Sequence, residues 1–238
     1  MEIDALRDAA CHANRDLARL GLVVLTFGNA SVADRAADLV AIKPSGMPCA
    51  DLDPEDVVIV RLSTGEPVAS HRRPSSDTPT HLELYRQFTG VGAIVHTHSV
   101  VATAWAQARR EIPALGTTHA DHFRGAVPVT RPLTAVEIAG DYERNTGRVI
   151  VERFADGLDP LAIPGVLVAS HGPFAWGPGP TEAVDNAAAV EFVARIAAHQ
   201  AAIGPLEPIS ADMLRRHFDR KHGPGAYYGQ PARLTRER

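Results

Sequence analysis

Cysteine is almost absent from this chain, with only Cys11 and Cys49 among 238 residues. Two cysteines exclude a disulfide framework and a cysteine-rich zinc ribbon, and they are typical of a reducing compartment. The chain also lacks an apolar run of the ~18 residues that a membrane span needs. Its first ten residues, MEIDALRDAA, carry acids where a signal peptide carries positive charge. These absences predict a cytoplasmic protein.

A surplus of positive charge is also missing, because the formal net charge is −4. A chain without a basic surplus lacks the electrostatic footprint of nucleic-acid binding, so we expect neither a nucleic acid nor a membrane as partner. Nucleotide-binding signatures are missing too. GVGAIV at residues 90–95 has no third glycine and precedes a strand, and no turn has the Walker pattern.

Short β-branched runs alternate with segments of helical periodicity. The predicted strands cover residues 21–27, 39–43, 57–62, 92–98, 127–130, 149–152 and 165–171. The predicted helices cover residues 3–20, 78–88, 100–110, 134–144 and 181–200. With no linker and no internal repeat, this mixture predicts a single α/β or α+β domain over residues 1–230. Residues 231–238 are expected to form a disordered basic tail.

Two histidines, His96 and His98, close the apolar run GAIVHTHSV. Residues i and i+2 of a strand point to the same face, so the two imidazoles project together. Their neutral nitrogens suit zinc or a similar divalent metal. His171 ends another predicted strand, and Gly172 and Pro173 leave that tip at a loop. Three histidines at two strand ends are suited to a metal site, but histidines that bond only to backbone explain the spacing at least as well.

Three turns carry groups that bind anions. KPSG at residues 43–46 offers an ammonium, a hydroxyl and a turn that glycine permits. Ser75 and Ser76 precede a predicted helix start, where backbone N–H groups favour an anion. FGNAS adds Asn29 in a third turn. Each turn alone is better explained as a plain turn or helix cap, but three such turns together make a phosphate pocket more credible.

Two further segments hold candidate acid–base groups. GTTHADHF at residues 116–123 places Asp121 in a polar stretch, either as a general base or as an ordinary loop acid. GAYYGQ at residues 225–230 holds two of the four tyrosines of the chain. One of them either packs or presents a phenol to an active site, and the residues alone leave both alternatives open.

Six motifs then carry a resemblance: KPSG, PSSDTPTH, IVHTHS, GTTHAD, SHGPFAWG and KHGPGAYYGQ. In this order they resemble the class II aldolase superfamily, and within it the L-ribulose-5-phosphate 4-epimerases of arabinose catabolism. The similarity extends from about residue 6 to residue 230. It implies a central, mainly antiparallel β-sheet flanked by helices. It also implies a homotetramer with active sites between neighbouring subunits.

The resemblance further implies a set of site residues. The metal, Zn²⁺ at one per subunit or else Mn²⁺ or another divalent ion, is expected on Asp77, His96, His98 and His171. The phosphorylated sugar is expected on Asn29, Lys43, Ser45, Gly46, Ser75 and Ser76, with Thr117 and His217 as further active-site positions. Asp121 and Tyr228 are implied as the acid–base pair, with Tyr228 reaching in from the adjacent subunit.

The implied reaction interconverts L-ribulose 5-phosphate and D-xylulose 5-phosphate. Proton abstraction at C4 would leave a carbanion with no adjacent carbonyl, and oxidation would need a nicotinamide. Breaking the C3–C4 bond instead leaves the electrons on C3, beside the carbonyl, where a cation such as zinc stabilises the charge.

Three alternatives stay open beside this reaction. The first is a class II sugar-phosphate aldolase of the fuculose-phosphate kind, in which a Glu usually stands at the position of Asp77. The second is an epimerase or decarboxylase acting on another pentulose phosphate. The third is a non-catalytic, adducin-like assembly module, which would lack the metal ligands.

Overall fold

The computed structural model describes residues 2–69 and 71–228, so the predicted tail, residues 231–238, lies outside the described residues. The elements, in chain order, are α1 (Ile3–Arg19), β1 (Asn29–Asp34), β2 (Leu39–Ile42), η1 (Cys49–Asp51), η2 (Pro54–Asp56), β3 (Val58–Arg61), β4 (Pro67–Ala69), α2 (Thr78–Gln87), β5 (Ala93–His96), α3 (Val100–Gln107), α4 (Thr117–Ala120), α5 (Ala135–Ala139), α6 (Tyr142–Ala155), β6 (Gly165–Leu167), β7 (Pro173–Gly177), α7 (Pro180–Ile203) and α8 (Ala211–His222). None of the helices in this part of the chain is long and apolar enough to cross a membrane.

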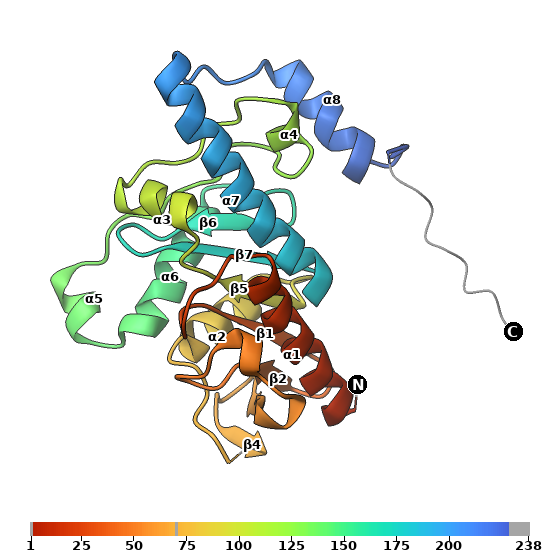
Figure 1. Ribbon diagram of the computed structural model, residues 1–238, viewed down its shortest axis with the longest axis vertical. Helices are drawn as coiled ribbons and strands as arrows, with labels where there is room; N and C mark the ends of the chain where they lie inside the picture. Colours follow the sequence, from red (N-terminus) through yellow and green to blue (C-terminus); the bar gives the residue numbers. More distant parts are fainter. Residues whose placement is uncertain (1, 70, 229–238) are drawn as a thin grey trace, which may run out of the picture.

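The strands of the described residues form one seven-stranded sheet in the order β4-β3-β2-β1-β5-β7-β6 (Figure 1). Every neighbouring pair of strands is antiparallel. The sheet and its flanking helices confirm the predicted architecture, a central antiparallel sheet in a mixed α/β fold.

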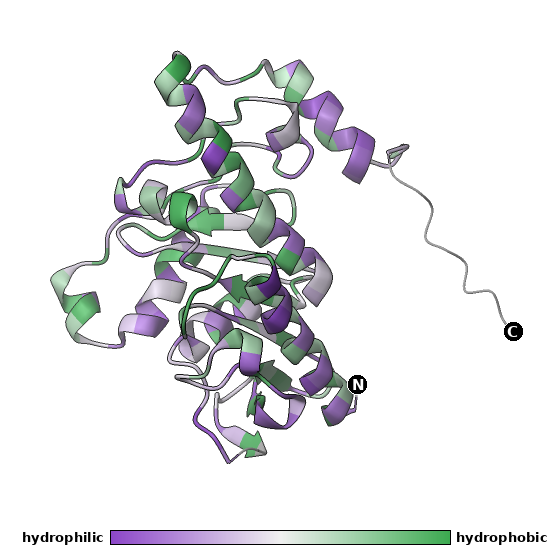
Figure 2. Cartoon of the chain, viewed as in Figure 1, coloured by the Kyte–Doolittle hydropathy of each residue, from purple (hydrophilic) through white to green (hydrophobic). Residues whose placement is uncertain are grey.

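Each strand divides its side chains between two hydrophobic cores, because successive residues of a strand point to opposite faces. In β2, Leu39 and Ala41 join the core under α1, whereas Val40 and Ile42 join the larger core formed with α2, α3, α6 and α7. The two cores therefore cover the two faces of the sheet. In contrast, α8 is mostly hydrophilic (Figure 2), with Phe218 as its buried residue.

The helices α2 and α6 pack directly against each other. A Cβ added to Gly147 of α6 would lie 2.7 Å from the Cβ of Glu83 in α2, so only glycine permits this approach. The Thr80 hydroxyl of α2 donates a hydrogen bond to the Glu143 carbonyl oxygen at the start of α6. The two contacts fix the first two turns of α6 relative to α2.

Four predicted elements differ from the structure. Residues 21–27 form a loop, and residues 149–152 belong to helix α6. Residues 127–130 make only isolated bridges, and the predicted helix over residues 134–144 breaks at Gly140 into α5 and α6. The predictions of strands 21–27 and 149–152 were wrong because short apolar runs fit a strand, a loop and a buried helix turn alike.

Candidate metal centre and anion pocket

Three chain segments meet at one end of the sheet. Asn29 begins β1 and His96 ends β5, and the antiparallel register places them directly opposite each other. His96 also lies opposite Phe174 of β7, so the loop that carries His171 just before β7 reaches the same end. Strand pairing therefore brings together residues that are far apart in the sequence.

The three histidines form a compact cluster of potential metal ligands. One nitrogen of each of His96, His98 and His171 lies within 4.8 Å of the others. The Nε2 atoms of His96 and His98 are 3.1 Å apart, close to the ~3.3 Å between two nitrogens of a tetrahedral zinc site with Zn–N bonds of about 2.05 Å. The buried Nδ1 of His171 has no hydrogen-bond partner among the described residues. These donors fit a divalent metal.

Contacts with β7 fix the orientation of His96. Its Nδ1 lies 3.0 Å from the Pro173 carbonyl oxygen, which can only accept, so Nδ1–H donates and Nε2 keeps its lone pair. The ring also stacks on Phe174, with the ring centroids 4.1 Å apart. A histidine oriented by a hydrogen bond from its other nitrogen is the usual arrangement for a metal ligand.

Burial also sets the protonation state of the cluster. It lowers the pKa of His96 to about 3 and lowers the pKa values of His98 and His171. All three imidazoles are therefore neutral near pH 7, which is the form that binds a metal ion.

Asp77 lies beside the histidines, immediately before α2. Burial raises the pKa of its carboxyl, but the His96 and His81 rings and the Asn29 amide lower it by more, so the net pKa lies below the usual value. The Asn29 Nδ2 donates to Asp77 Oδ2 at 2.6 Å and to Ser75 Oγ at 3.2 Å. Asp77 is thus an oriented carboxylate at the edge of the histidine cluster, and its role as the fourth ligand stays a prediction.

A cavity of about 410 Å³ opens above the cluster. The predicted metal and phosphate residues line it together: Asn29, Lys43, Ser45, Gly46, Ser75, Ser76, Asp77, His96, His98 and His171. Lys43 follows β2 and is almost fully buried, so burial lowers the pKa of its ammonium. Its Nζ donates to the carbonyl oxygens of Met47 at 2.6 Å and Thr26 at 3.3 Å. A buried ammonium beside serine hydroxyls is a suitable site for a phosphate.

Gly28 allows the turn before β1 to pack closely against the end of β5 beside the cavity. Its φ is +79°, a conformation that favours glycine. A Cβ there would lie 2.7 Å from the His96 carbonyl oxygen. The FGNAS turn therefore needs glycine at this position to bring Asn29 next to β5.

Sequence reasoning missed Tyr142 and Glu143, which lie in the first turn of α6 and line this cavity. The Tyr142 ring centroid is 6.3 Å from that of His171. Burial raises the pKa of the Tyr142 phenol, and the nearby Asp77 carboxylate raises it further. The sequence signal that could have located them is the pair Gly140-Asp141, because Gly140 follows the last residue of α5 and Asp141 precedes the first residue of α6.

The remaining predicted residues gather elsewhere. Thr117 begins α4, Asp121 follows it, and His217 and Tyr228 come from α8 and the segment after it. In one chain α4 and α8 lie beside each other at the end of the molecule opposite β4 (Figure 1). Among the described residues that line the metal-site cavity, none comes from this group. The predicted site residues therefore form two separate groups within one subunit.

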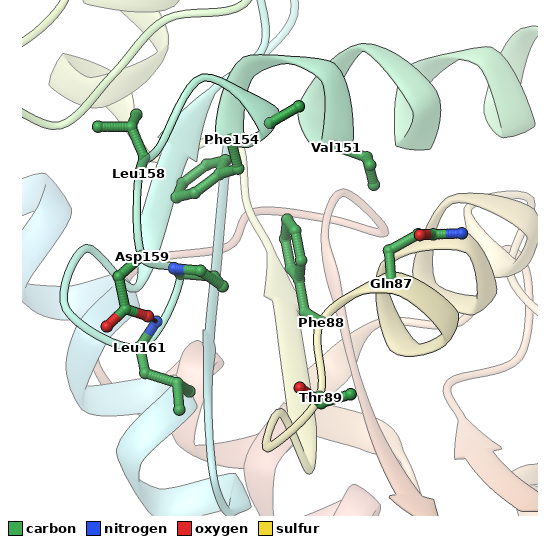
Figure 3. A pocket seen from close by; sticks show the side chains of 10 residues that line it. Gln87, Phe88, Thr89, Val151, Phe154, Leu158, Asp159 and Leu161 are labelled. Atoms are coloured by element: carbon green, nitrogen blue, oxygen red, sulfur yellow. Dashed lines mark hydrogen bonds between the residues drawn. The ribbon is translucent and has the colours of Figure 1, made fainter.

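A second cavity, of about 450 Å³, lies between α2, α6 and the loop before β6 (Figure 3). Phe88, Phe154, Leu158 and Leu161 give it apolar walls, and Asp159 is its acidic residue. The described residues that line it include no histidine, cysteine or lysine, so its chemistry does not suit a metal or a phosphate.

Comparison with known proteins gives a consistent family assignment. The family model described as the class II aldolase and adducin N-terminal domain matches residues 8–198. Among solved structures, an L-fuculose 1-phosphate aldolase is 24% identical, with 91% of this chain and 95% of that chain covered at a TM-score of 0.76. The L-fuculose-1-phosphate aldolase from Thermus thermophilus is 26% identical, with 84% and 97% covered at a TM-score of 0.65. A sugar-phosphate aldolase from Thermotoga maritima is 19% identical, with 84% and 96% covered at a TM-score of 0.66.

Proposed function

The chain belongs to the class II aldolase and adducin family, and on this basis we propose that it is a metal-dependent epimerase of L-ribulose 5-phosphate and D-xylulose 5-phosphate. The observation that carries the proposal is the state of Asp77. Its side chain is short, and its carboxylate is ionised and held by the Asn29 amide at 2.6 Å. In this proposal a carboxylate fixed beside the histidine cluster serves as a metal ligand, so the acid–base groups come from elsewhere, namely Asp121 and Tyr228 in the epimerase interpretation.

The proposed reaction breaks and re-forms the C3–C4 bond of the sugar. The C4 hydroxyl loses its proton to one acid–base residue as the bond electrons move to C3 and C4 becomes an aldehyde carbon. The aldehyde turns its other face to C3, the bond re-forms, and the second residue returns a proton to the C4 oxygen. Bound by His96, His98, His171 and Asp77, a divalent cation such as Zn²⁺ supplies Lewis-acid stabilisation of the negative charge on the substrate oxygens.

The phosphate group must stay bound while the aldehyde rotates. We assign this task to Lys43, Asn29, Ser75 and the neighbouring Ser45–Gly46 and Ser76 turns, which share the cavity with the histidines. An anchor separate from the metal ligands leaves the aldehyde free to rotate after the C3–C4 bond is broken. This separation supports a phosphorylated ketose as the substrate.

A complete site needs a second subunit in this proposal. Asp121 and Tyr228 lie away from the cavity of their own chain, together with Thr117 and His217. A homotetramer with its active sites at subunit interfaces would bring this group to the cavity of the neighbour. The cavity of each chain would then receive its acid–base pair from the adjacent one.

An aldolase that releases its products is the second candidate, because structural relatives of this chain are L-fuculose 1-phosphate aldolases. Both activities cleave a carbon–carbon bond beside a carbonyl. They differ in whether the aldehyde leaves or recombines. A non-catalytic adducin-like module is less well supported, since the histidine cluster and the lysine of the cavity are both present.

A coupled assay of the purified protein tests the proposal. We expect conversion of L-ribulose 5-phosphate to D-xylulose 5-phosphate, loss of this activity after chelation, and recovery with Zn²⁺ or Mn²⁺. Parallel assays with L-xylulose 5-phosphate and L-fuculose 1-phosphate separate the alternatives. Full epimerisation in excess chelator, or cleavage of fuculose phosphate without any epimerisation, is incompatible with the proposal.

A further inference from the structure

Arg220 of α8 connects the two residues proposed as the acid–base pair. Its Nε donates to Asp121 Oδ1 at 3.0 Å and its Nη2 donates to Asp121 Oδ2 at 2.6 Å, a bidentate ion pair. The carbon at the centre of the same guanidinium lies 4.7 Å from the centroid of the Tyr228 ring. One side chain therefore contacts both groups at once.

The main chain strengthens this connection. The N–H groups of Tyr227 and Tyr228 donate to the Arg220 carbonyl oxygen at 3.0 Å and 3.1 Å. The segment after α8 thus folds back onto the residue whose side chain contacts Asp121. As a result, the position of the Tyr228 ring depends on where Arg220 is held.

The ion pair is partly shielded from water, unlike an ordinary surface pair. The side chains of Arg220 and Asp121 are 23% and 13% exposed. His217 Nδ1 lies 3.1 Å from Asp121 Oδ1 and adds a second contact from the same helix. A planar guanidinium matches a carboxylate with two parallel hydrogen bonds, which an ammonium does not reproduce.

Other groups around Asp121 are also basic. His222 Nε2 contacts the Asp121 carbonyl oxygen at 2.9 Å, Lys221 acts on the carboxylate through its charge, and His122 follows Asp121 in the chain. Burial raises the pKa of Asp121, but the hydrogen bonds from Arg220 and His217 lower it by more, so the net pKa lies below the usual value. Asp121 is thus a carboxylate at neutral pH, in a fixed orientation.

We propose that Arg220 is a positioning residue that holds Asp121 and Tyr228 as one rigid unit, so that both reach the substrate together. This inference rests on the proposed epimerase function and goes beyond it, because it assigns the geometry of the pair to a third residue. Arg220 acts through its two neighbours and needs no contact with the sugar.

Arg220→Gln tests the proposal, with Arg215→Gln as the matched control on the same helix. Arg215 makes a solvent-exposed ion pair with Asp212, so its loss removes an equal charge without touching Asp121. We expect Arg220→Gln to lower kcat for epimerisation at least about tenfold with KM within about twofold, since positioning acts on the transition state. Arg215→Gln should retain wild-type values. Metal content and the thermal unfolding midpoint show that each variant is folded.

Arg220→Lys and a double-mutant cycle complete the test. Lysine keeps the positive charge but lacks the two parallel N–H donors of the guanidinium, so we expect an intermediate kcat in a fully folded protein. In the Asp121→Asn background, Arg220→Gln should add less than about twofold, because the two residues act together. A folded Arg220→Gln or Arg220→Lys variant with wild-type kcat overturns the inference. So does a double variant in which the loss of kcat equals the product of the losses in the two single variants.

The outcomes also separate this inference from the proposed function. If the wild-type protein cleaves fuculose phosphate and does not epimerise, the epimerase proposal fails and the same variants are judged by kcat for cleavage. If the wild-type protein has neither activity, both proposals fail. If the wild type epimerises and the Arg220 variants do too, at an unchanged rate, only the positioning role fails.

Discussion

The carboxylate of Glu191 accepts a hydrogen bond from the main-chain N–H of Ala102 at 2.9 Å, although 89 residues separate the two. The N–H of Val101 points at the same carboxylate, at 3.1 Å. These N–H groups belong to the first turn of α3, which starts two residues after His98, and the Ser99 side chain makes no capping hydrogen bond. Glu191 of α7 therefore caps α3 from a distance and fixes the loop that carries His98.

Replacing Glu191 by Gln should weaken both the fold and the metal site. The amide keeps one acceptor but loses the negative charge that interacts with the N-terminus of α3, so we expect the free energy of unfolding to fall by about 1–3 kcal/mol. The His98 loop then loses its anchor, and the affinity for Co²⁺ or Zn²⁺ should fall as well. Urea unfolding of the metal-free protein and titration with Co²⁺, followed by its visible absorption, measure the two effects.

Arg195→Gln is the control for this variant. Arg195 is 63% exposed and forms the 3.5 Å ion pair with Glu191 on the outer side of α7, and such an exposed partner contributes less than about 1 kcal/mol. Its variant should bind Co²⁺ like the wild type. A Glu191→Gln protein with unchanged unfolding and unchanged Co²⁺ affinity contradicts the capping role.

The stability of the metal-free protein should decrease in acid because of buried histidines. Burial lowers the pKa of His81 to about 4, although the Asp77 carboxylate opposes the shift, and burial also lowers the pKa of His119 to about 4. In the unfolded chain both groups titrate near pH 6.5. Between these values the unfolded state binds more protons, so the free energy of unfolding should fall by about 2 kcal/mol or more as the pH drops from 7 to 4.

Urea unfolding at several pH values measures this slope. His119→Gln removes one titrating group and keeps an N–H donor for the Gly125 carbonyl oxygen, which His119 contacts at 2.6 Å. Its slope should be smaller than that of the wild type. His12 is exposed, so His12→Gln should leave the slope unchanged. Identical slopes in the His119 and His12 variants exclude this explanation.

The Lys43 ammonium should determine affinity for the phosphate of the substrate. Lys43→Met keeps most of the side-chain volume in its buried position and removes the charge. We expect KM for L-ribulose 5-phosphate to rise at least about tenfold while the metal content stays the same, because a charge-assisted contact with phosphate is lost. Steady-state kinetics and metal analysis measure the two quantities. Arg61→Gln, which removes a cation exposed at the end of β3, should leave KM unchanged, and equal effects of the two variants count against a phosphate site at Lys43.

Much of the fold could be predicted where the pattern was long or strictly alternating. The helices near residues 3–20 and 181–200 have apolar positions at helical spacing over several turns, and both are present as α1 and α7. In contrast, VIVE at residues 149–152 has only three apolar residues, and packing of α6 against α2 decides its structure. β1, β4, β7, α4 and α8 were missed. β1 carries mostly small or polar residues, β7 is a five-residue run bounded by Pro173 and Gly177, and α8 has one buried residue.

The residues of the candidate site also divide into those that the sequence pattern predicts and those that only the fold brings together. His96 and His98 could be paired from sequence because a strand places residues i and i+2 on the same face. His171 and Asn29 join them through the antiparallel register, which only the fold supplies. Arg220 carried no signal in the sequence, because one arginine among several basic residues of RRHFDRKH is not distinguished until its contact with Asp121 is seen.

The separation of the two groups of site residues leads to a complementation prediction. If each active site combines the cavity of one chain with Asp121 and Tyr228 of its neighbour, two inactive variants should restore activity in one assembly. A chain with Asp121→Asn keeps its histidines, and a chain with His98→Asn keeps its acid–base pair. If the two chains mix randomly in equal amounts, about a quarter of the sites combine the cavity of an Asp121→Asn chain with the acid–base pair of a His98→Asn chain. Only these sites are complete.

Co-expression of differently tagged chains, with mixed assemblies isolated through both tags, tests this prediction. We expect about a quarter of wild-type kcat from the mixed assemblies and almost none from either variant alone. The matched control combines Asp121→Asn with Tyr228→Phe. No site in that mixture has a complete acid–base pair, because both residues come from the same chain. Mixed assemblies of the first kind that stay inactive while binding metal place the acid–base pair and the cavity in the same chain, which excludes a shared site.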